Sequence, residues 1–241
     1  LMESLSAKGI QSVFVLDYNS PPNGYTLSTP EGREAYAAFA KAAAAHYKSR
    51  GVLWEVYNES YVAGSWAPKS SAEDYVALVK AVYPAVKSAD PAAAVVVPAV
   101  LGYAKSYTQK CLSLGLLNNA DAILVHPYRS PNPEMTIPDL QALRDMLRSY
   151  PPKGLDIPII SAEQAAANNI QRVLLSNLAA GVRLSVLCDS NIEPLQLFTS
   201  KLKGYKFVTR LESKNDEYLL LFSGPEGYRL AAWTTADVKN V

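Results

Sequence analysis

The chain has 241 residues, of which 49% are hydrophobic and 19% are charged, and its formal net charge is +1. This balance is typical of a folded globular protein and excludes a disordered or fibrous chain. A charge so close to zero also lacks the basic surface on which a nucleic-acid partner would bind.

The first predicted strand covers residues 10–18, a run rich in β-branched and aromatic residues that leads into a loop of Pro, Gly and Asn. An Ala-rich stretch follows and predicts a helix. Thr29 suits the N-terminal cap of this helix, Pro30 its first position and Gly51 its C-terminal stop.

The second predicted strand covers residues 52–60, and Ser70 and Glu73 then have the spacing of a capping box at the start of a second helix. Further strands are expected at 93–100, 122–128, 156–163 and 183–189, and further helices at 108–117, 138–150 and 164–180.

Strand and helix alternate six times, which predicts a parallel sheet of the α/β class. Such strands are covered on both faces and therefore read as uniformly apolar, as these do. The pattern changes near the C-terminus to two predicted hairpins with turns at "KND" and "GPEG". We expect a barrel-type domain over residues 1–200 and a small all-β module over residues 201–241.

Polar residues recur where the predicted parallel strands end, which is the edge at which α/β folds place their functional groups. Two of them, Glu59 and Glu163, are glutamates on separate strands. Paired carboxylates across a sugar are what glycoside hydrolysis needs, because one protonates the leaving oxygen while the other attacks the anomeric carbon. The polar residues at these ends are Asp17, Tyr18, Asn58, Glu59, His126, Tyr128, Glu163 and Asp189.

The segments "WEVYNES", "VHPY" and "PIISAE" resemble the acid/base strand and the sixth and seventh strands of clan A glycoside hydrolases. Together with "FVLDY", "NLAAGVRLSV" and "LKGYKF" they resemble bacterial proteins close to glycoside hydrolase family 39. The resemblance implies a (β/α)8-type TIM barrel. It also implies that this chain lacks the first two barrel strands, which leaves six βα units.

The resemblance further implies a retaining hydrolase of a β-linked sugar or exopolysaccharide, with Glu59 as general acid/base and Glu163 as nucleophile. Asn58 would then bind the sugar 2-hydroxyl, and His126 and Tyr128 would line the same subsite. A core histidine bonded to the backbone is the alternative for His126, and a helix N-terminal glutamate is the alternative for Glu163.

Three further residues carry two interpretations each. Trp66, in the loop after the acid/base strand, is either a stacking platform for a sugar or a packed core indole. Asp17 and Tyr18 either form the floor of the sugar-binding pocket or close the loop after the first strand.

The sequence departs from the clan A pattern at several positions, and these departures favour an alternative to hydrolysis. No residue matches the arginine that clan A members usually carry on the second strand, Ser60 replaces the usual proline, and Leu187 and Cys188 replace aromatic residues. The chain could therefore be a catalytically impaired, carbohydrate-binding pseudoenzyme or a truncated glycosidase fragment.

Cofactors, metals and membranes are not implied by the sequence. The two cysteines lack the spacing of a disulfide framework or a zinc site, and we expect no cofactor. The longest apolar stretch, "PAAAVVVPAVLGYA", is too short to span a bilayer, and "LMESLSAKGI" does not read as a signal peptide. The expected partner is a carbohydrate substrate, and the resemblance alone points to a secreted or periplasmic location.

Overall fold

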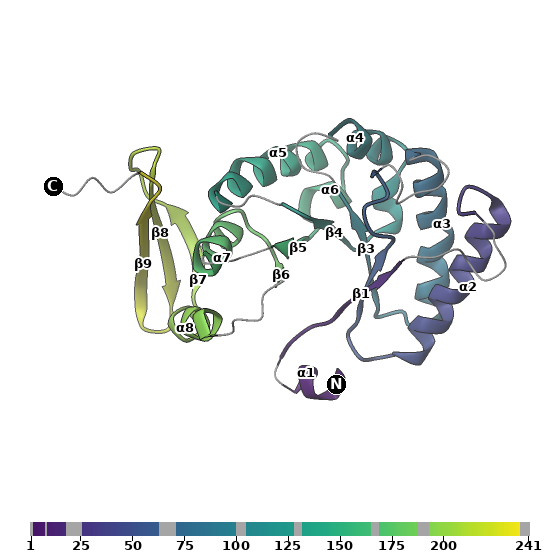
Figure 1. Cartoon of the computed structure of the whole chain (residues 1–241), viewed down its shortest axis with the longest axis horizontal. Helices are drawn as coiled ribbons and strands as arrows, with labels where there is room; N and C mark the ends of the chain where they lie inside the picture. The colour runs from purple at the N-terminus through teal and green to yellow at the C-terminus, as the bar shows by residue number, and fades with distance from the viewer. Residues whose placement is uncertain are drawn as a thin grey trace. The chain divides into compact units, whose positions relative to one another are not determined.

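The computed structural model describes residues 2–7, 9–17, 26–62, 71–99, 105–127, 132–164, 169–187 and 193–236, with the backbone alone at 163, 164 and 187 (Figure 1). Strands and helices alternate along these residues as the sequence predicts. The strands are β1 (Val13–Leu16), β2 (Leu53–Val56), β3 (Ala94–Pro98), β4 (Ala122–Val125), β5 (Ile159–Gln164), β6 (Leu184–Leu187), β7 (Lys206–Arg210), β8 (Glu217–Gly224) and β9 (Gly227–Thr234). The α-helices are α1 (Met2–Ser6), α2 (Pro30–His46), α3 (Ala72–Ala89), α4 (Lys105–Ser113), α5 (Thr136–Arg148), α6 (Lys153–Asp156), α7 (Ile170–Ala179) and α8 (Glu193–Leu202), and η1 (Leu116–Asn119) and η2 (Pro133–Met135) are 3₁₀-helices.

Six strands form one sheet in the order β1-β2-β3-β4-β5-β6, and β7-β8-β9 form a second, three-stranded sheet. The first sheet is parallel, and its register places Glu55 opposite Val15 on one side and Val96 on the other. Neighbouring strands are consecutive in the chain, as a succession of βα units requires. The predicted fold class, a TIM-barrel type with six βα units and an antiparallel β appendix, is confirmed.

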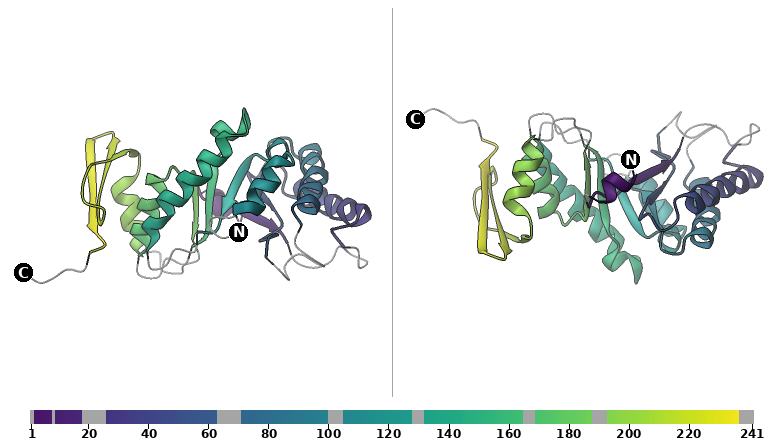
Figure 2. Two further views of the ribbon diagram at one scale, coloured as in Figure 1. Left: turned by 90° about the horizontal axis from the view of Figure 1, so that it is seen from above. Right: turned by 90° about the horizontal axis from the view of Figure 1, so that it is seen from below.

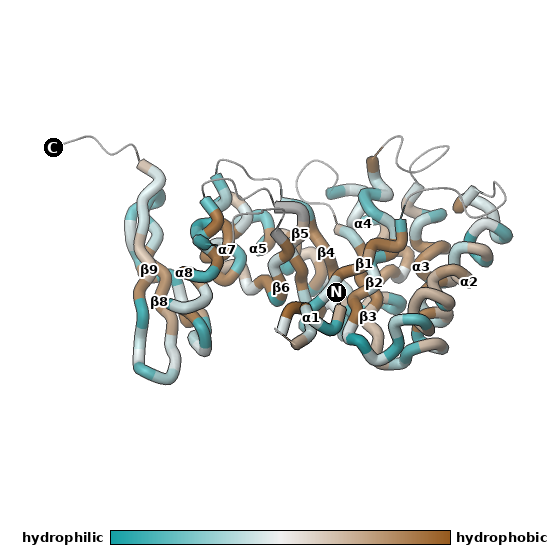
Figure 3. The backbone as a smooth tube through the Cα atoms, turned by 60° about the horizontal axis from the view of Figure 1, so that its bottom comes forward, coloured by the Kyte–Doolittle hydropathy of each residue, from teal (hydrophilic) through white to brown (hydrophobic). Residues whose placement is uncertain are grey.

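The central strands β3 and β4 are buried. Val95, Val96 and Val97 of β3 are all fully buried, and so are Ile123 and Leu124 of β4. In Figure 3 these strands are coloured mainly as hydrophobic, whereas the helices have both hydrophobic and hydrophilic positions. Continuous burial explains why the strands read as uniform apolar runs.

Helix α2 begins where the sequence predicts. The Thr29 side chain accepts a hydrogen bond from the Gly32 N–H at 3.1 Å, and Pro30 occupies the first turn. The helix ends at His46, earlier than the predicted stop. Ser49 and Gly51 then take positive φ angles of 61° and 67°, so Gly51 ends the connection rather than the helix.

Helix α3 lies beside α2 in both Figure 1 and Figure 2, and the two helices are in contact. Its N-terminal cap is Ser71, whose side chain accepts from the Asp74 N–H at 3.1 Å. The predicted capping box of Ser70 and Glu73 is therefore wrong by one residue, and Ser70 itself lies outside the described residues.

The chain forms two compact units, Leu1–His126 with Ala142–Ile160, and Pro127–Gln141 with Ser161–Val241. We call them the N-terminal and the C-terminal unit. The predicted domain boundary at residue 200 stays a prediction.

The C-terminal unit joins α7 and α8 to the antiparallel sheet. Leu220 and Phe222 of β8 are buried against Leu175 of α7. Helix α8, which contributes Phe198 to the same cluster, follows β6 as the sixth predicted βα unit requires, although the sequence analysis names no residue range for it. All the residues of this helix are exposed or half-buried.

A buried ion pair holds the same unit together. The side chain of Glu134, in η2, is only 2% exposed and receives two hydrogen bonds from Arg172 of α7, from Nε at 2.6 Å and from Nη2 at 2.8 Å. Trp233 of β9 donates its indole N–H to the same carboxylate at 2.7 Å. Burial alone would raise the pKa of Glu134, but these donors and a backbone N–H outweigh it and lower the pKa.

Candidate functional site

The candidate site of the N-terminal unit lies at the carboxyl ends of β1, β2 and β4. The chain leaves β2 in a tight turn, in which Tyr57 and Glu59 have positive φ angles of 61° and 46°. Asp17, directly after β1, accepts a hydrogen bond from the Asn58 N–H at 3.4 Å. Asp17 therefore links the end of β1 to the turn after β2, and both interpretations of its role stay predictions.

A second contact fixes the end of β1. The hydroxyl of Tyr36, on α2, donates to the carbonyl oxygen of Leu16. Burial, and then the nearby Asp17 carboxylate, raise the pKa of Tyr36 well above the ordinary value for tyrosine, so this hydroxyl stays a donor at all physiological pH values.

Two side chains meet one oxygen of the Glu59 carboxyl group. The Tyr61 hydroxyl donates to Oε1 at 3.2 Å, and Nδ1 of His126 lies 3.4 Å from the same atom. The Glu59 side chain is 23% exposed whereas His126 is only 4% exposed. The carboxyl group of Glu59 is thus reachable from solvent, while the imidazole of His126 is enclosed.

A second hydroxyl pair supports this turn. The Tyr107 hydroxyl, on α4, donates to Oγ of the fully buried Ser60 at 3.1 Å. Burial raises the pKa of Tyr107 well above its ordinary value. Ser60 is therefore a hydrogen-bonding anchor for Tyr107 at this turn.

Tyr61 and Tyr107 are contacts of the site that the sequence reasoning missed. Tyr61 could have been found, because it follows Glu59 by two residues in the same turn. Tyr107 is 47 residues from its partner Ser60, and no local pattern marks that pairing.

The remaining predicted residues are less fully described. Glu163 lies on strand β5, which runs to Gln164, whereas α7 begins only at Ile170. Glu163 is therefore a strand residue and not the first residue of a helix, which excludes the alternative interpretation of it as a helix N-terminal glutamate. Tyr18, Trp66, Tyr128 and Cys188 lie outside the described residues.

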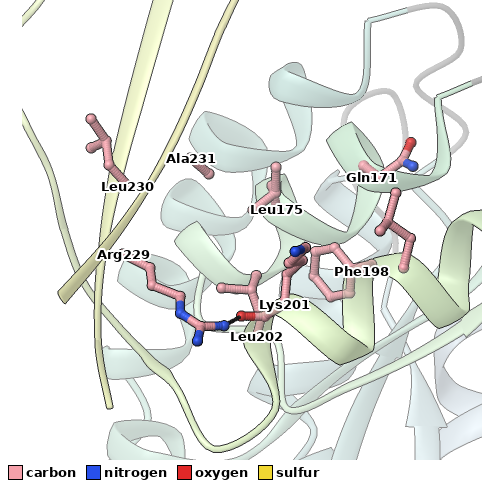
Figure 4. A pocket seen from close by; sticks show the side chains of 9 residues that line it. Gln171, Leu175, Phe198, Lys201, Leu202, Arg229, Leu230 and Ala231 are labelled. Atoms are coloured by element: carbon pink, nitrogen blue, oxygen red, sulfur yellow. Dashed lines mark hydrogen bonds between the residues drawn. The ribbon is translucent and has the colours of Figure 1, made fainter. Parts of the chain in front are cut away.

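A separate cavity lies within the C-terminal unit and has a different character (Figure 4). It has a volume of about 440 Å³ and contains none of the predicted site residues. Arg229 is held at its edge by a hydrogen bond to the Lys201 carbonyl oxygen. Most of its lining is apolar, so it lacks the carboxylates that a glycosidase site needs. The lining residues are Gln171, Leu175, Leu197, Phe198, Lys201, Leu202, Arg229, Leu230 and Ala231.

In the part of the chain that the structure describes, no three His, Cys, Asp or Glu side chains gather as a metal ion would require. Among the helices described, none is both long and apolar enough to cross a membrane.

Comparison with solved structures finds glycoside hydrolases. A glucosidase from Croceicoccus marinus matches with a TM-score of 0.63 and 11% identity over 93% of this chain and 60% of its own. A Cellulomonas fimi endo-β-1,4-mannanase matches with a TM-score of 0.57 and 11% identity over 96% of this chain and 78% of its own. The catalytic core of a xylanase A gives a TM-score of 0.52 and 13% identity, over 77% and 69%.

These identities are low, so the likeness concerns the fold. No protein-family model matches the chain, and no curated protein matches it. The chain spans 60% of the length of the Croceicoccus glucosidase. The described part of the chain therefore has a fold like that of these TIM-barrel glycoside hydrolases, with six parallel strands and helices between them.

Proposed function

We propose that the chain is a retaining glycoside hydrolase that acts on a β-linked sugar or an exopolysaccharide. The observation that carries this proposal is the Glu59 carboxyl group, which follows a buried parallel strand and is partly exposed beside His126 and Tyr61. A backbone with positive φ at Glu59 adds weight, because strained residues concentrate at functional sites.

In this proposal the reaction proceeds in two displacements. Glu163 attacks the anomeric carbon as Glu59 gives a proton to the leaving oxygen, and a glycosyl-enzyme ester forms. Glu59 then takes a proton from water, which attacks the anomeric carbon and releases Glu163. Asn58 binds the sugar 2-hydroxyl, and His126, Tyr128 and Trp66 line the sugar site.

A closer relationship to family 39 belongs to the same proposal. The proposed reaction uses no metal and no redox cofactor.

The deciding experiment traps the glycosyl-enzyme. A 2-deoxy-2-fluoro glycoside with a good leaving group is incubated with the chain, and the labelled peptide is identified by mass spectrometry. We expect the label on Glu163 in the wild type and in Glu59→Gln, and none in Glu163→Gln. Glu212→Gln, a change at an exposed glutamate of the β7–β8 connection, serves as the matched control and should label normally.

Hydrolysis measurements complete the test. Both Glu59→Gln and Glu163→Gln should lose turnover by about 10²-fold or more while saccharide binding persists. Saccharide binding by the wild type with no label and no turnover would refute hydrolysis and support the pseudoenzyme alternative. Unchanged rates in either variant would remove that residue from the mechanism.

A further inference from the structure

Two potential donors lie on the same side of the Glu59 carboxyl group. The Tyr61 hydroxyl is 3.2 Å from Oε1, and His126 Nδ1 is 3.4 Å from it. The tyrosine hydroxyl is a donor here, and the imidazole is a second donor when Nδ1 carries the hydrogen. An oxygen that accepts from such neighbours is a poor place for a carboxylic acid proton.

The Tyr61 ring is held in place by its surroundings. It lies 6.3 Å from the Tyr107 ring, centroid to centroid, with an angle of 59° between the planes. Tyr107 is in turn anchored by its hydrogen bond to buried Ser60, the neighbour of both Glu59 and Tyr61 in the chain. Helix α4 therefore supports the hydroxyl that meets Glu59.

We infer that Tyr61 is a positioning residue that fixes Oε1 of Glu59 as an acceptor and so directs the acid proton to Oε2. This inference rests on the proposed function. In the first displacement the O–H bond at Oε2 breaks, its proton passes to the leaving oxygen, and the electron pair stays on the carboxylate. The Tyr61 O–H stabilises the resulting charge at Oε1, and in the second displacement a water proton returns to Oε2.

The contact can be tested without a substrate. Glutamate labelled with ¹³C at Cδ gives a carboxyl resonance for Glu59, which is assigned by its loss in Glu59→Gln. We expect Tyr61→Phe to shift this resonance by more than a linewidth. Tyr83→Phe is the matched control, because Tyr83 also donates to a carboxylate at 3.2 Å, that of Asp121, and should leave the Glu59 resonance in place. A resonance that stays in place in Tyr61→Phe overturns the inference.

The role in catalysis is tested by the leaving group. The dinitrophenolate of a dinitrophenyl β-glycoside can leave without a proton. The methanol of a methyl β-glycoside of the same sugar needs a proton from the enzyme as it leaves. We expect Tyr61→Phe to reduce kcat/KM, which reports the first displacement alone, about tenfold or more for the methyl glycoside and to leave kcat/KM for the dinitrophenyl glycoside unchanged. Equal loss on both substrates, or no loss on either, overturns the positioning role.

The two proposals fail in different ways. If the chain is not a hydrolase, the wild type and Glu59→Gln show no difference in turnover, although the carboxyl resonance still reports the tyrosine contact. If only the role of Tyr61 is wrong, Glu59→Gln loses turnover while Tyr61→Phe cleaves both glycosides as the wild type does.

Discussion

Replacing Arg172 with Met removes the cation from a buried carboxylate in the C-terminal unit. Glu134 is only 2% exposed and accepts two hydrogen bonds from Arg172, at 2.6 and 2.8 Å. Methionine keeps much of the apolar stem of the side chain but none of its donors. The Glu134 carboxylate would then stay buried without its counter-charge.

The expected loss of stability follows from this geometry. Breaking a buried ion pair by removing one partner typically costs about 3–5 kcal/mol, mainly because a charge is left uncompensated. The Arg172 side chain is 27% exposed, and the Trp233 N–H remains as a donor, so we expect a loss near the lower end, about 3 kcal/mol.

The contribution of Glu134 to the pH dependence of the free energy of unfolding should change sign in Arg172→Met. In the wild type the pKa of Glu134 is lowered from 4.5, so its stabilising contribution is complete above that value and is lost as the pH falls through the folded pKa. In Arg172→Met, burial without a cation should raise the pKa of this carboxyl group. The variant should therefore gain stability as the pH falls from neutral toward about 4, because protonation neutralises the buried charge.

Urea unfolding followed by circular dichroism, together with amide exchange in β8 and β9, measures both effects. Arg210→Met is the control. It removes a cation from β7 of the three-stranded sheet, 4.1 Å from the Tyr218 ring, but it takes no partner from a buried carboxylate. A loss in Arg172→Met no larger than in the control, or a loss that grows at low pH, would refute the reasoning.

Two further predictions concern the N-terminal unit. Burial raises the pKa of the Cys111 thiol to about 12, so this thiol should resist iodoacetamide in the native chain and react in urea, as mass spectrometry would show; rapid native labelling would contradict it. Leu78 of α3 is fully buried, so Leu78→Ala should destabilise the chain by about 2–5 kcal/mol in thermal unfolding. Leu155→Ala, at a position that is 53% exposed, should change stability by less than about 0.5 kcal/mol, and similar effects of the two would count against the assigned core.

The sheet could be predicted from the sequence because burial on both faces leaves a strong local signal. The runs that became β2, β3 and β4 are uniformly apolar, and Thr29 with Pro30 marks a helix start that the structure confirms. Helix ends were harder to predict. Ser70 and Ser71 are chemically equal candidates for the cap of α3, and only the path of the backbone selects Ser71.

The candidate site could be predicted in part, because position at a strand end is visible in the sequence whereas contact across elements is not. Glu59 and Asn58 were found from their position at the end of a strand. The contact between Tyr107 and Ser60 depends on how α4 packs against the turn after β2, and that packing is a tertiary property. The buried pair of Glu134 and Arg172 spans 38 residues and was missed for the same reason.

Under the proposed function, the turn around Asn58 lowers folding stability in order to hold the Glu59 carboxyl group in place. A left-handed backbone costs an ordinary residue about 1–2 kcal/mol relative to the right-handed one, and Tyr57 and Glu59 both have it. Glycine would remove this cost at either position, yet at residue 59 it would also remove the carboxyl group. Selection of this chain for heat resistance alone would therefore favour loss of Glu59, so a thermostability screen on it must also score the function of the site.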